Sequence, residues 1–375
     1  MSQSYTPGLK VTPRCRWRAK RMLPLMGNVL VEVGQRVTAQ QIIAQTELPG
    51  PAVPINLARL IGVTPGELPQ RLLRHAGEQV AVAEPIARTK GFFGLFERDY
   101  PSPATGVLES ISQVSGQIIV RGQPLAVRVM AYLSGTVVEV IPDNGAVIET
   151  EAAVVQGIFG IGGEAYGPLA FVADSPQDTL SDDRILPKHR GQVLIGGGRI
   201  TGAAIRKAAQ LGVSAVVAGG IDDQDLKEIL GYDLGVAVTG TETIGTTVII
   251  TEGFGDIAMA KRTFELLRQH NGKEVSVNGA TQIRAGVMRP EIIVCLEGAQ
   301  GSQPLGDRVA EGTLKVGTAV RIIREPNFGS LGTVNGLPSE LQTLESGSKA
   351  RVVQVKLANG QSVIVPRANV ELIAE

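Results

Sequence analysis

The sequence predicts a multi-domain protein of β and α/β structure, and three observations lead to this fold class. First, its 375 residues exceed one average domain, because domains hold roughly 150 residues each. Second, 46 glycines and 21 prolines stand against only 4% aromatic residues, which is typical of many turns and of short strands with aliphatic cores. Third, strand-like and helix-like segments alternate in the middle of the chain, whereas the segments on either side are mostly strand-like.

The overall charge and the cysteine content limit the kinds of partner and compartment. Thirty-six basic residues balance 36 acidic ones, so the chain as a whole has no field that would attract nucleic acid or an anionic membrane. Only Cys15 and Cys295 are present, which excludes a disulfide framework and a cysteine metal site. No apolar run reaches the roughly 18 residues of a transmembrane segment. We therefore expect a cytoplasmic protein without a bound metal.

Residues 1–22 form a basic arm with six Lys or Arg residues and no acidic residue. Between Arg14 and Lys20 the basic residues alternate with small or apolar ones, a pattern that places the charges on one face of a strand. One interpretation is an amphipathic edge strand that closes the first barrel. The alternative is an arm that contacts RNA, because Arg pairs with phosphate and Trp stacks on bases. The nucleic-acid candidates in this arm are Arg14, Arg16, Trp17 and Arg18.

An internal repeat is the clearest feature of the next region. Residues 34–46 (GQRVTAQQIIAQT) align without gaps on residues 77–89 (GEQVAVAEPIART). Residues 102–111 (SPATGVLESI) recur more loosely as residues 131–141 (AYLSGTVVEVI), each with a glycine turn that opens an alternating strand. The repeat predicts two related β-structures.

These repeated motifs resemble the barrel-sandwich hybrid fold of biotinyl and lipoyl carrier domains, and also the N-terminal region of the C subunit of Rnf electron-transport complexes. The resemblance implies a domain of this kind over residues 23–167. A helical insertion is expected near residues 55–74, where Thr64-Pro-Gly-Glu67 has the spacing of a capping box.

Carrier domains display their modified lysine at a hairpin tip, and Lys90 lies near the equivalent place. Its neighbours do not match the Met-Lys-Met or Asp-Lys-Ala context of those domains, so we expect neither lipoyl nor biotin on Lys90 and predict no cofactor. Four large apolar residues beside it form a candidate anchor for a protein partner, or else fill a satellite core. They are Phe92, Phe93, Leu95 and Phe96.

Residues 168–297 read as an α/β domain with a parallel sheet. Its most distinctive segment is a glycine loop that follows a strand near residue 193 and opens a helix at 201–211, where backbone amides could bind a phosphate. Acidic residues after the next strand stand where a ribose-binding carboxylate is expected, although glycines also simply turn a strand into a helix. Further helices are predicted at 222–230 and 256–270, and strands at 214–218, 236–238, 246–251, 274–278 and 292–295. The ligand-binding candidates are Gly196, Gly197, Gly198, Arg199, Thr201, Gly202, Asp222 and Asp223.

Catalytic residues are weakly indicated. Glu242 and Glu252 stand near the ends of two predicted strands, where open α/β sheets place ligands, and could act as acid and base. Either residue could equally cap a helix or face solvent. No hydrolase, metalloprotease or Walker lysine motif occurs.

Residues 298–311 read as a linker, because small and turn-forming residues replace periodic apolar ones. Residues 312–375 then contain five short alternating segments, with Asn359-Gly360 as a hairpin turn. Gly317, Val320, Ile322, Phe328, Gly329, Gly332 and Val334 resemble a KOW module, an SH3-like barrel. The resemblance implies contact with RNA, ribosome or RNA polymerase, or a protein-contact module. The nucleic-acid candidates are Arg321, Arg324, Lys349, Arg351 and Arg367.

These observations favour a non-enzymatic scaffold or adaptor within a larger assembly, with a protein partner or a second copy of the chain. Two alternatives stay open. One is an RNA-, ribosome- or polymerase-associated factor that acts through the KOW-like barrel, and the other is an enzyme or sensor that binds a nucleotide or small anion at the glycine loop. Each of these folds hosts many functions, so the sequence does not decide between them.

Overall fold

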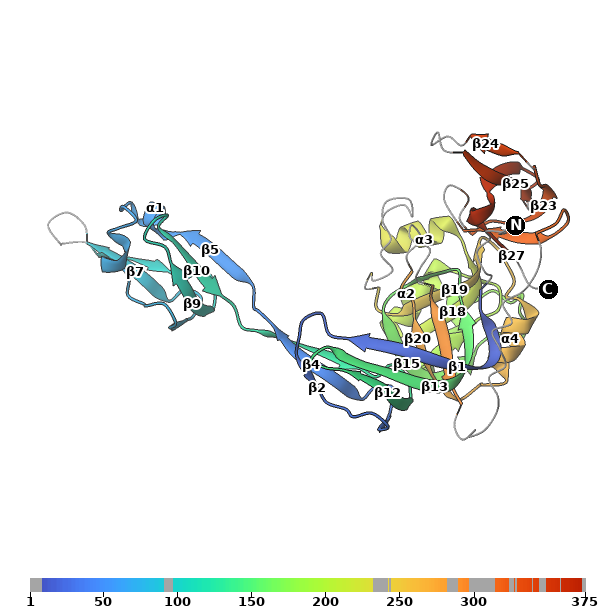
Figure 1. Ribbon diagram of the computed structural model, residues 1–375, viewed down its shortest axis with the longest axis horizontal. Coiled ribbons are helices and arrows are strands. Elements are labelled where there is room, and N and C mark those ends of the chain that lie inside the picture. The colour runs from blue at the N-terminus through green and yellow to red at the C-terminus, as the bar shows by residue number, and fades with distance from the viewer. Residues whose placement is uncertain are drawn as a thin grey trace.

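The computed structural model shows an elongated, β-rich protein (Figure 1). Strands account for 48% and helices for 14% of the chain, which confirms the expected dominance of β-structure. A β-rich arm extends from a body that contains most of the helices, and the C-terminal strands lie at the opposite end of the molecule (Figure 1). The structure describes residues 9–90, 97–231, 242, 244–281, 289–296, 314–323, 327, 329–338, 340–343, 349–357 and 359–372.

The base of the arm is a β-structure that we call the proximal unit. Its core contains Ile43, Leu133 and Ile148, all fully buried, because apolar residues alternate with polar ones along its strands. Its strands are β1 (Val11–Met22), β2 (Asn28–Val29), β3 (Arg36–Val37), β4 (Ile42–Leu48), β11 (Leu125–Met130), β12 (Gly135–Ile141) and β13 (Gly145–Gln156).

The outer part of the arm is a second β-structure, the distal unit, with its own core around Leu57, Leu108 and Ile118. Helical structure in the predicted 55–74 segment consists of two short pieces, because Gly62 ends the first one in the left-handed conformation. The elements are β5 (Ala52–Asn56), α1 (Leu57–Ile61), the 3-10 helix η1 (Leu68–Gln70), β6 (Gln79–Val80), β7 (Pro85–Lys90), β8 (Glu97–Pro101), β9 (Gly106–Ile111) and β10 (Gln117–Arg121).

The two units have the same strand pairing, so the sequence repeat corresponds to a repeated structure. β3 pairs with β12 in the proximal unit as β6 pairs with β9 in the distal unit, and β4 pairs with β11 as β7 pairs with β8. The register agrees in detail, since Met130 pairs with Ile42 across a bulge, and Pro101 pairs with Pro85 across a bulge at the same place.

Equivalent glycines open the two copies of the repeat. Gly34 has φ +88° and donates a 2.8 Å backbone hydrogen bond to Val137, while Gly77 has φ +92° and donates one of the same length to Leu108. Glycine adopts a positive φ without steric strain because it has no Cβ, which explains why this residue recurs at the start of each copy.

The distal unit is inserted into the hairpin that β4 and β11 of the proximal unit would otherwise form. Leu48 and Leu125 are the last paired residues of that hairpin, and residues 49–51 and 122–124 lead from them into the distal unit. Within this neck the Gly122 amide donates a 2.9 Å hydrogen bond to the Pro51 carbonyl. A Cβ on Gly50 would collide with the Gly122 carbonyl, so the two chain segments can lie this close only with glycine there.

The body is built on a mixed sheet that continues from the proximal unit through β13. The sheet order is β14-β19-β18-β16-β15-β20-β21-β13-β12-β3, in which β15, β16, β18 and β19 are parallel neighbours. The strands are β14 (Phe159–Ile161), β15 (Glu164–Phe171), β16 (Val193–Ile195), β17 (Arg199–Ile200), β18 (Ala215–Ile221), β19 (Thr247–Phe254), β20 (Glu274–Asn278) and β21 (Glu291–Cys295). The helices are α2 (Gly202–Leu211), α3 (Asp223–Leu230) and α4 (Lys261–Arg268).

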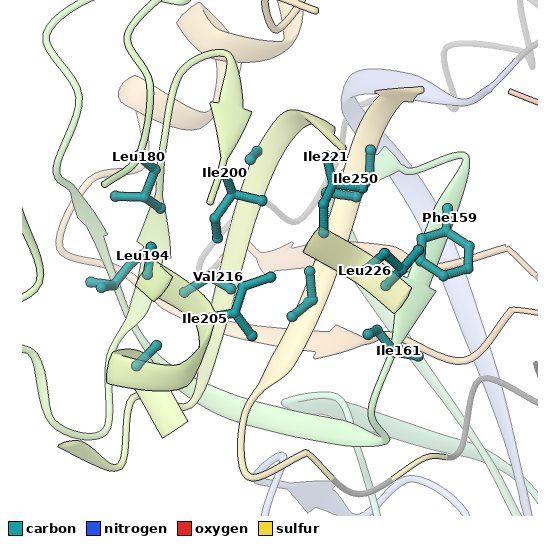
Figure 2. Close-up of a cluster of buried hydrophobic side chains, with 14 of the residues drawn as sticks. Phe159, Ile161, Leu180, Leu194, Ile200, Ile205, Val216, Ile221, Leu226 and Ile250 are labelled. Carbon is teal, nitrogen blue, oxygen red and sulfur yellow. The ribbon is translucent and has the colours of Figure 1, made fainter. Parts of the chain in front are cut away.

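Local sequence explains where the helices begin and end. Thr201 and Asp222 cap α2 and α3 through their side chains, and Gly212 and Gly231 end these helices in the left-handed conformation. One face of the sheet carries a core that includes Ile205 from α2 and Leu226 from α3, packed against Val216, Ile250 and their neighbours (Figure 2). The strand expected at 236–238 lies outside the described residues.

A six-stranded sheet forms the C-terminal part, and it packs directly on the body. Ile323 joins the core of the body beside Phe254, and a Cβ on Gly253 would collide with the Gly329 carbonyl. The predicted hairpin turn is present, with Gly360 at φ +86°. The strands are β22 (Ala319–Ile322), β23 (Leu331–Gly336), β24 (Leu341–Thr343), β25 (Lys349–Leu357), β26 (Ser362–Pro366) and β27 (Val370–Leu372).

Within the described part of the chain, every helix is too short or too polar to cross a membrane.

Candidate functional site

The glycine loop connects β16 to α2 and uses its amides within the fold. Gly196 donates to the Val217 carbonyl and Gly198 to the Asp178 carbonyl, both at 2.8 Å. A Cβ on Gly197 would collide with the Ser175 carbonyl. The glycines at this loop therefore let neighbouring backbone approach closely.

The predicted ligand-binding residues do lie together, since Ile200 pairs with Ile221 and so sets the loop beside the start of α3. Asp222 caps α3 by accepting a 2.9 Å hydrogen bond from the Gln224 amide. Desolvation and the neighbouring Asp222 carboxylate raise the pKa of Asp223. Ligand binding at this loop stays a prediction.

Asp225, which the sequence analysis did not single out, reaches the N-terminus of α2. Its Oδ1 atom would lie 3.0 Å from a Cβ on Gly202, the first residue of that helix, and Arg199 Nη2 is 3.6 Å from its Oδ2 atom. The chain therefore supplies a negative charge of its own where a bound phosphate would interact with the helix dipole.

We expect Asp225→Asn to lower the free energy of unfolding by about 0.5–1 kcal/mol at low salt, because the helix dipole and Arg199 lose a partly buried charge. Urea denaturation at low and high salt measures this, and salt should shrink the difference by screening. Glu228→Gln is the control, since Glu228 lies 3.7 Å from Arg206 in an exposed pair. Equal stability of wild type and Asp225→Asn would show that Asp225 does not compensate the dipole.

Glu252, one of the two catalytic candidates, lies on β19 in an ion-pair network with the C-terminal sheet. Its Oε1 atom accepts a 3.0 Å hydrogen bond from the Ala260 amide, and its Oε2 atom is 2.9 Å from Arg321 Nη2. Glu242 is half-buried, and a catalytic role for it stays a prediction.

The same network continues into the C-terminal sheet. Arg321 donates through Nη1 to Glu371 at 2.7 Å, and Glu371 also pairs with Arg289 at 2.7 Å. Arg321 and Glu371 are almost fully buried, with side-chain exposures of 4% and 1%. Arg321, a nucleic-acid candidate in the sequence, is thus turned inward to two carboxylates that hold the C-terminal sheet on the body.

The other C-terminal candidates differ in their surroundings. Arg367 is half-buried and donates to the Val352 and Pro338 carbonyls at 3.1 and 2.8 Å, whereas Arg351 is exposed. Arg324 and the Lys349 side chain lie outside the described residues, as do Phe92, Phe93, Leu95 and Phe96. The Lys90 side chain is likewise not described.

The basic arm forms the strand β1 with the alternation that its sequence predicts. Arg16 and Arg18 are exposed and share Glu149, at 3.6 and 2.6 Å, while Arg14 pairs with Glu151 through Nε at 2.9 Å. Trp17 lies on the opposite face, half-buried against the core of the proximal unit. Nucleic-acid contact by this strand stays a prediction.

A buried acidic and phenolic cluster lies where the proximal unit meets the body. Tyr132 is 2% exposed, and its φ of +69° is strained for a bulky residue. Its hydroxyl donates a 3.0 Å hydrogen bond to Glu291, and its carbonyl accepts one of 2.5 Å from Ser276. Tyr132 and Glu291 are 159 positions apart, and no sequence pattern links them, so the sequence carries no signal for this cluster.

The charges around this cluster shift its protonation. Burial raises the pKa of Glu291 to about 7, with Glu164 adding to the effect, while the Tyr132 hydrogen bond and Arg21 oppose it. Burial also raises the pKa of Tyr132 far above its ordinary value. Arg21 lies 5.2 Å from the Tyr132 ring centroid and pairs with Glu164 at 2.8 Å. A carboxyl that titrates near neutrality can exchange a proton there.

The described residues contain no group of three or more His, Cys, Asp or Glu side chains that could hold a metal ion. No family model matches the sequence, and no curated protein matches it either.

Proposed function

We propose that the protein is a non-enzymatic cytoplasmic scaffold that joins partners within a larger assembly. It would do so through a barrel-sandwich hybrid arm, a central α/β domain and a C-terminal KOW-like SH3 barrel. The observation that carries this proposal is the position of the distal unit, which stands away from the body at the end of a two-stranded neck (Figure 1).

A repeated unit carried at a distance suits the binding of a partner. Inside the distal unit the core is complete, with Leu108 and Ile118 fully buried, so the unit does not need the body to exclude water. The β7–β8 hairpin, which Arg88 and Asp99 stabilise through a 2.6 Å contact, leads to the apolar residues predicted as an anchor. Four apolar side chains could supply the centre of a protein interface.

The body and C-terminal sheet supply a second attachment point. The Arg321–Glu252 and Arg289–Glu371 ion pairs and the shared core around Ile323 fix the C-terminal sheet to the body. Partners bound at the two ends of the molecule would therefore be held apart. A scaffold needs this separation, whereas an enzyme needs convergent groups around a substrate.

A deletion of the distal unit tests the proposal. We expect a variant in which an Asn-Gly turn joins Leu48 to Leu125 to fold, because these residues already pair at the end of a hairpin. Wild type and variant are purified with a tag from the protein's own cells, with and without nuclease. The variant should lose one set of co-purifying proteins and retain another, and nuclease should change neither set.

Two outcomes would contradict the scaffold. Recovery of wild type as a lone monomer would remove the proposed function altogether. Loss of ribosomal or polymerase subunits on nuclease treatment would instead favour the RNA-associated alternative. Circular dichroism and cooperative unfolding of the variant confirm that the body is intact.

A further inference from the structure

The strand β1 is a long edge of the sheet. It has 12 residues and, among the described strands, pairs only with β13. An edge strand presents unpaired backbone groups that another extended chain can pair with.

The register shows which residues present those groups. The Leu23 amide donates a 2.7 Å hydrogen bond to the Asn144 carbonyl, and a Cβ on Gly145 would collide with the Arg21 carbonyl. The backbone amides and carbonyls of Arg21 and Leu23 therefore point toward β13. Backbone groups of alternate residues point to opposite sides of a strand. Lys20, Arg18 and Arg16 therefore direct their amides and carbonyls away from β13.

The distal unit provides an internal comparison. β5 pairs with β10 there as β1 pairs with β13 in the proximal unit. Pro54 pairs with Ile119, and Lys20 pairs with Val147. Ile119 and Val147 lie beside the bulge at the same place in the two units, so Pro54 and Lys20 are equivalent positions. A proline has no amide to donate, which blocks strand addition. The distal edge is thus protected, whereas the edge of β1 keeps its amide at this position.

The side chains of β1 define what would fit beside it. Arg16 and Arg18 are 56% and 63% exposed on one face and share a single carboxylate, Glu149. The opposite face carries Cys15 and Trp17, which pack on the core of the proximal unit. A matching strand would place acidic side chains beside the arginines and apolar ones beside Trp17.

We propose that the outer edge of β1, between Arg16 and Lys20, binds by strand addition an extended segment of a partner protein in which acidic and apolar residues alternate. This deepens the proposed scaffold function, on which it rests, by giving the chemistry of one partner. A second copy of the chain fits less well, because pairing that kept the apolar faces together would set Arg and Lys opposite Arg and Lys.

The test uses the full-length protein and a labelled synthetic peptide of ten residues in which Glu and Val alternate, with fluorescence anisotropy as the readout. Lys20→Pro copies the natural block at Pro54 and should weaken binding about tenfold through loss of a backbone hydrogen bond. Lys20→Ala keeps the amide and should change affinity far less. Arg16→Glu alters only an exposed side chain and should also weaken binding, and a peptide with Lys in place of Glu should not bind.

Equal binding to wild type and Lys20→Pro, or equal binding of the Glu and Lys peptides, would overturn the proposal. If Lys20→Pro fails to fold, Arg16→Glu decides in its place. A wild-type dimer that Lys20→Pro abolishes would assign the edge to a second copy. If proteins still co-purify with wild type while the peptide does not bind, the strand-addition site is wrong and the scaffold proposal is retained. If no protein co-purifies with wild type, the scaffold proposal itself is wrong.

Discussion

Glu371→Gln is expected to lower the free energy of unfolding by about 3 kcal/mol, because it leaves two arginines without their shared carboxylate in a buried site. Arg321 is only 4% exposed, so water cannot replace the lost charge. Glu252 remains as the single carboxylate partner of Arg321, which is why the loss should stay below that of a fully isolated buried charge.

Chemical denaturation of the purified protein measures this change, and limited proteolysis shows whether the C-terminal sheet separates from the body. Lys261→Gln is the matched control, because it breaks an exposed ion pair with Glu265 that should contribute under about 0.5 kcal/mol. If Glu371→Gln were as stable as the control, the network would not hold the C-terminal sheet in place.

Glu291→Gln is expected to make stability less dependent on pH and to raise it in mildly alkaline solution. The folded protein raises the pKa of Glu291 from 4.5 to about 7, so it binds the proton more tightly than the unfolded chain does. The stabilising contribution of the protonated carboxyl is complete below about pH 4.5 and is lost as the pH rises through 7. At about 1.4 kcal/mol per pKa unit, the loss of stability between these limits amounts to about 3 kcal/mol.

The amide of the glutamine variant stays neutral and can still accept the hydrogen bond from Tyr132. Wild type and Glu291→Gln should therefore be similar in stability near pH 5, and the variant should be more stable near pH 8. Thermal unfolding between pH 5 and pH 8 measures the difference in stability between wild type and Glu291→Gln. Groups that titrate alike in both proteins do not contribute to this difference. Glu47→Gln, an exposed carboxylate, serves as the control. Parallel pH profiles for wild type and Glu291→Gln would show that Glu291 does not titrate as the burial implies.

Local features of the fold could be predicted from sequence because they depend on neighbouring residues. The predicted boundaries of α2 and α3, which begin at the caps Thr201 and Asp222, agree with the observed ones to within one residue. The strand β20 matches the predicted range 274–278. The repeat of 34–46 at 77–89 likewise corresponds to two units with one pattern of pairing. Such signals act within a few positions of the chain or recur visibly along it.

The nesting of one unit within the other and the contacts between distant strands could not be predicted in this way. Tyr132 meets Glu291, and Arg321 meets Glu252, only because the sheet order brings their strands together. Asp225 was missed for a related reason, since its partners Arg199 and Gly202 belong to another helix and its loop. Charge alone also cannot distinguish an arginine that faces solvent from one that, like Arg321, is buried.

The neck at residues 49–51 and 122–124 fixes how far the distal unit lies from the proximal unit. Paired strands lie on both sides of this neck. A backbone rotation at Gly50 and Gly122 would therefore change the direction in which the distal unit points, but not its distance from the neck. If the proposed scaffold binds a molecule at the distal unit, that molecule would be confined to a small volume around the body. Confinement of this kind raises the effective concentration of one bound molecule for another, so two weak contacts would act together as one strong attachment.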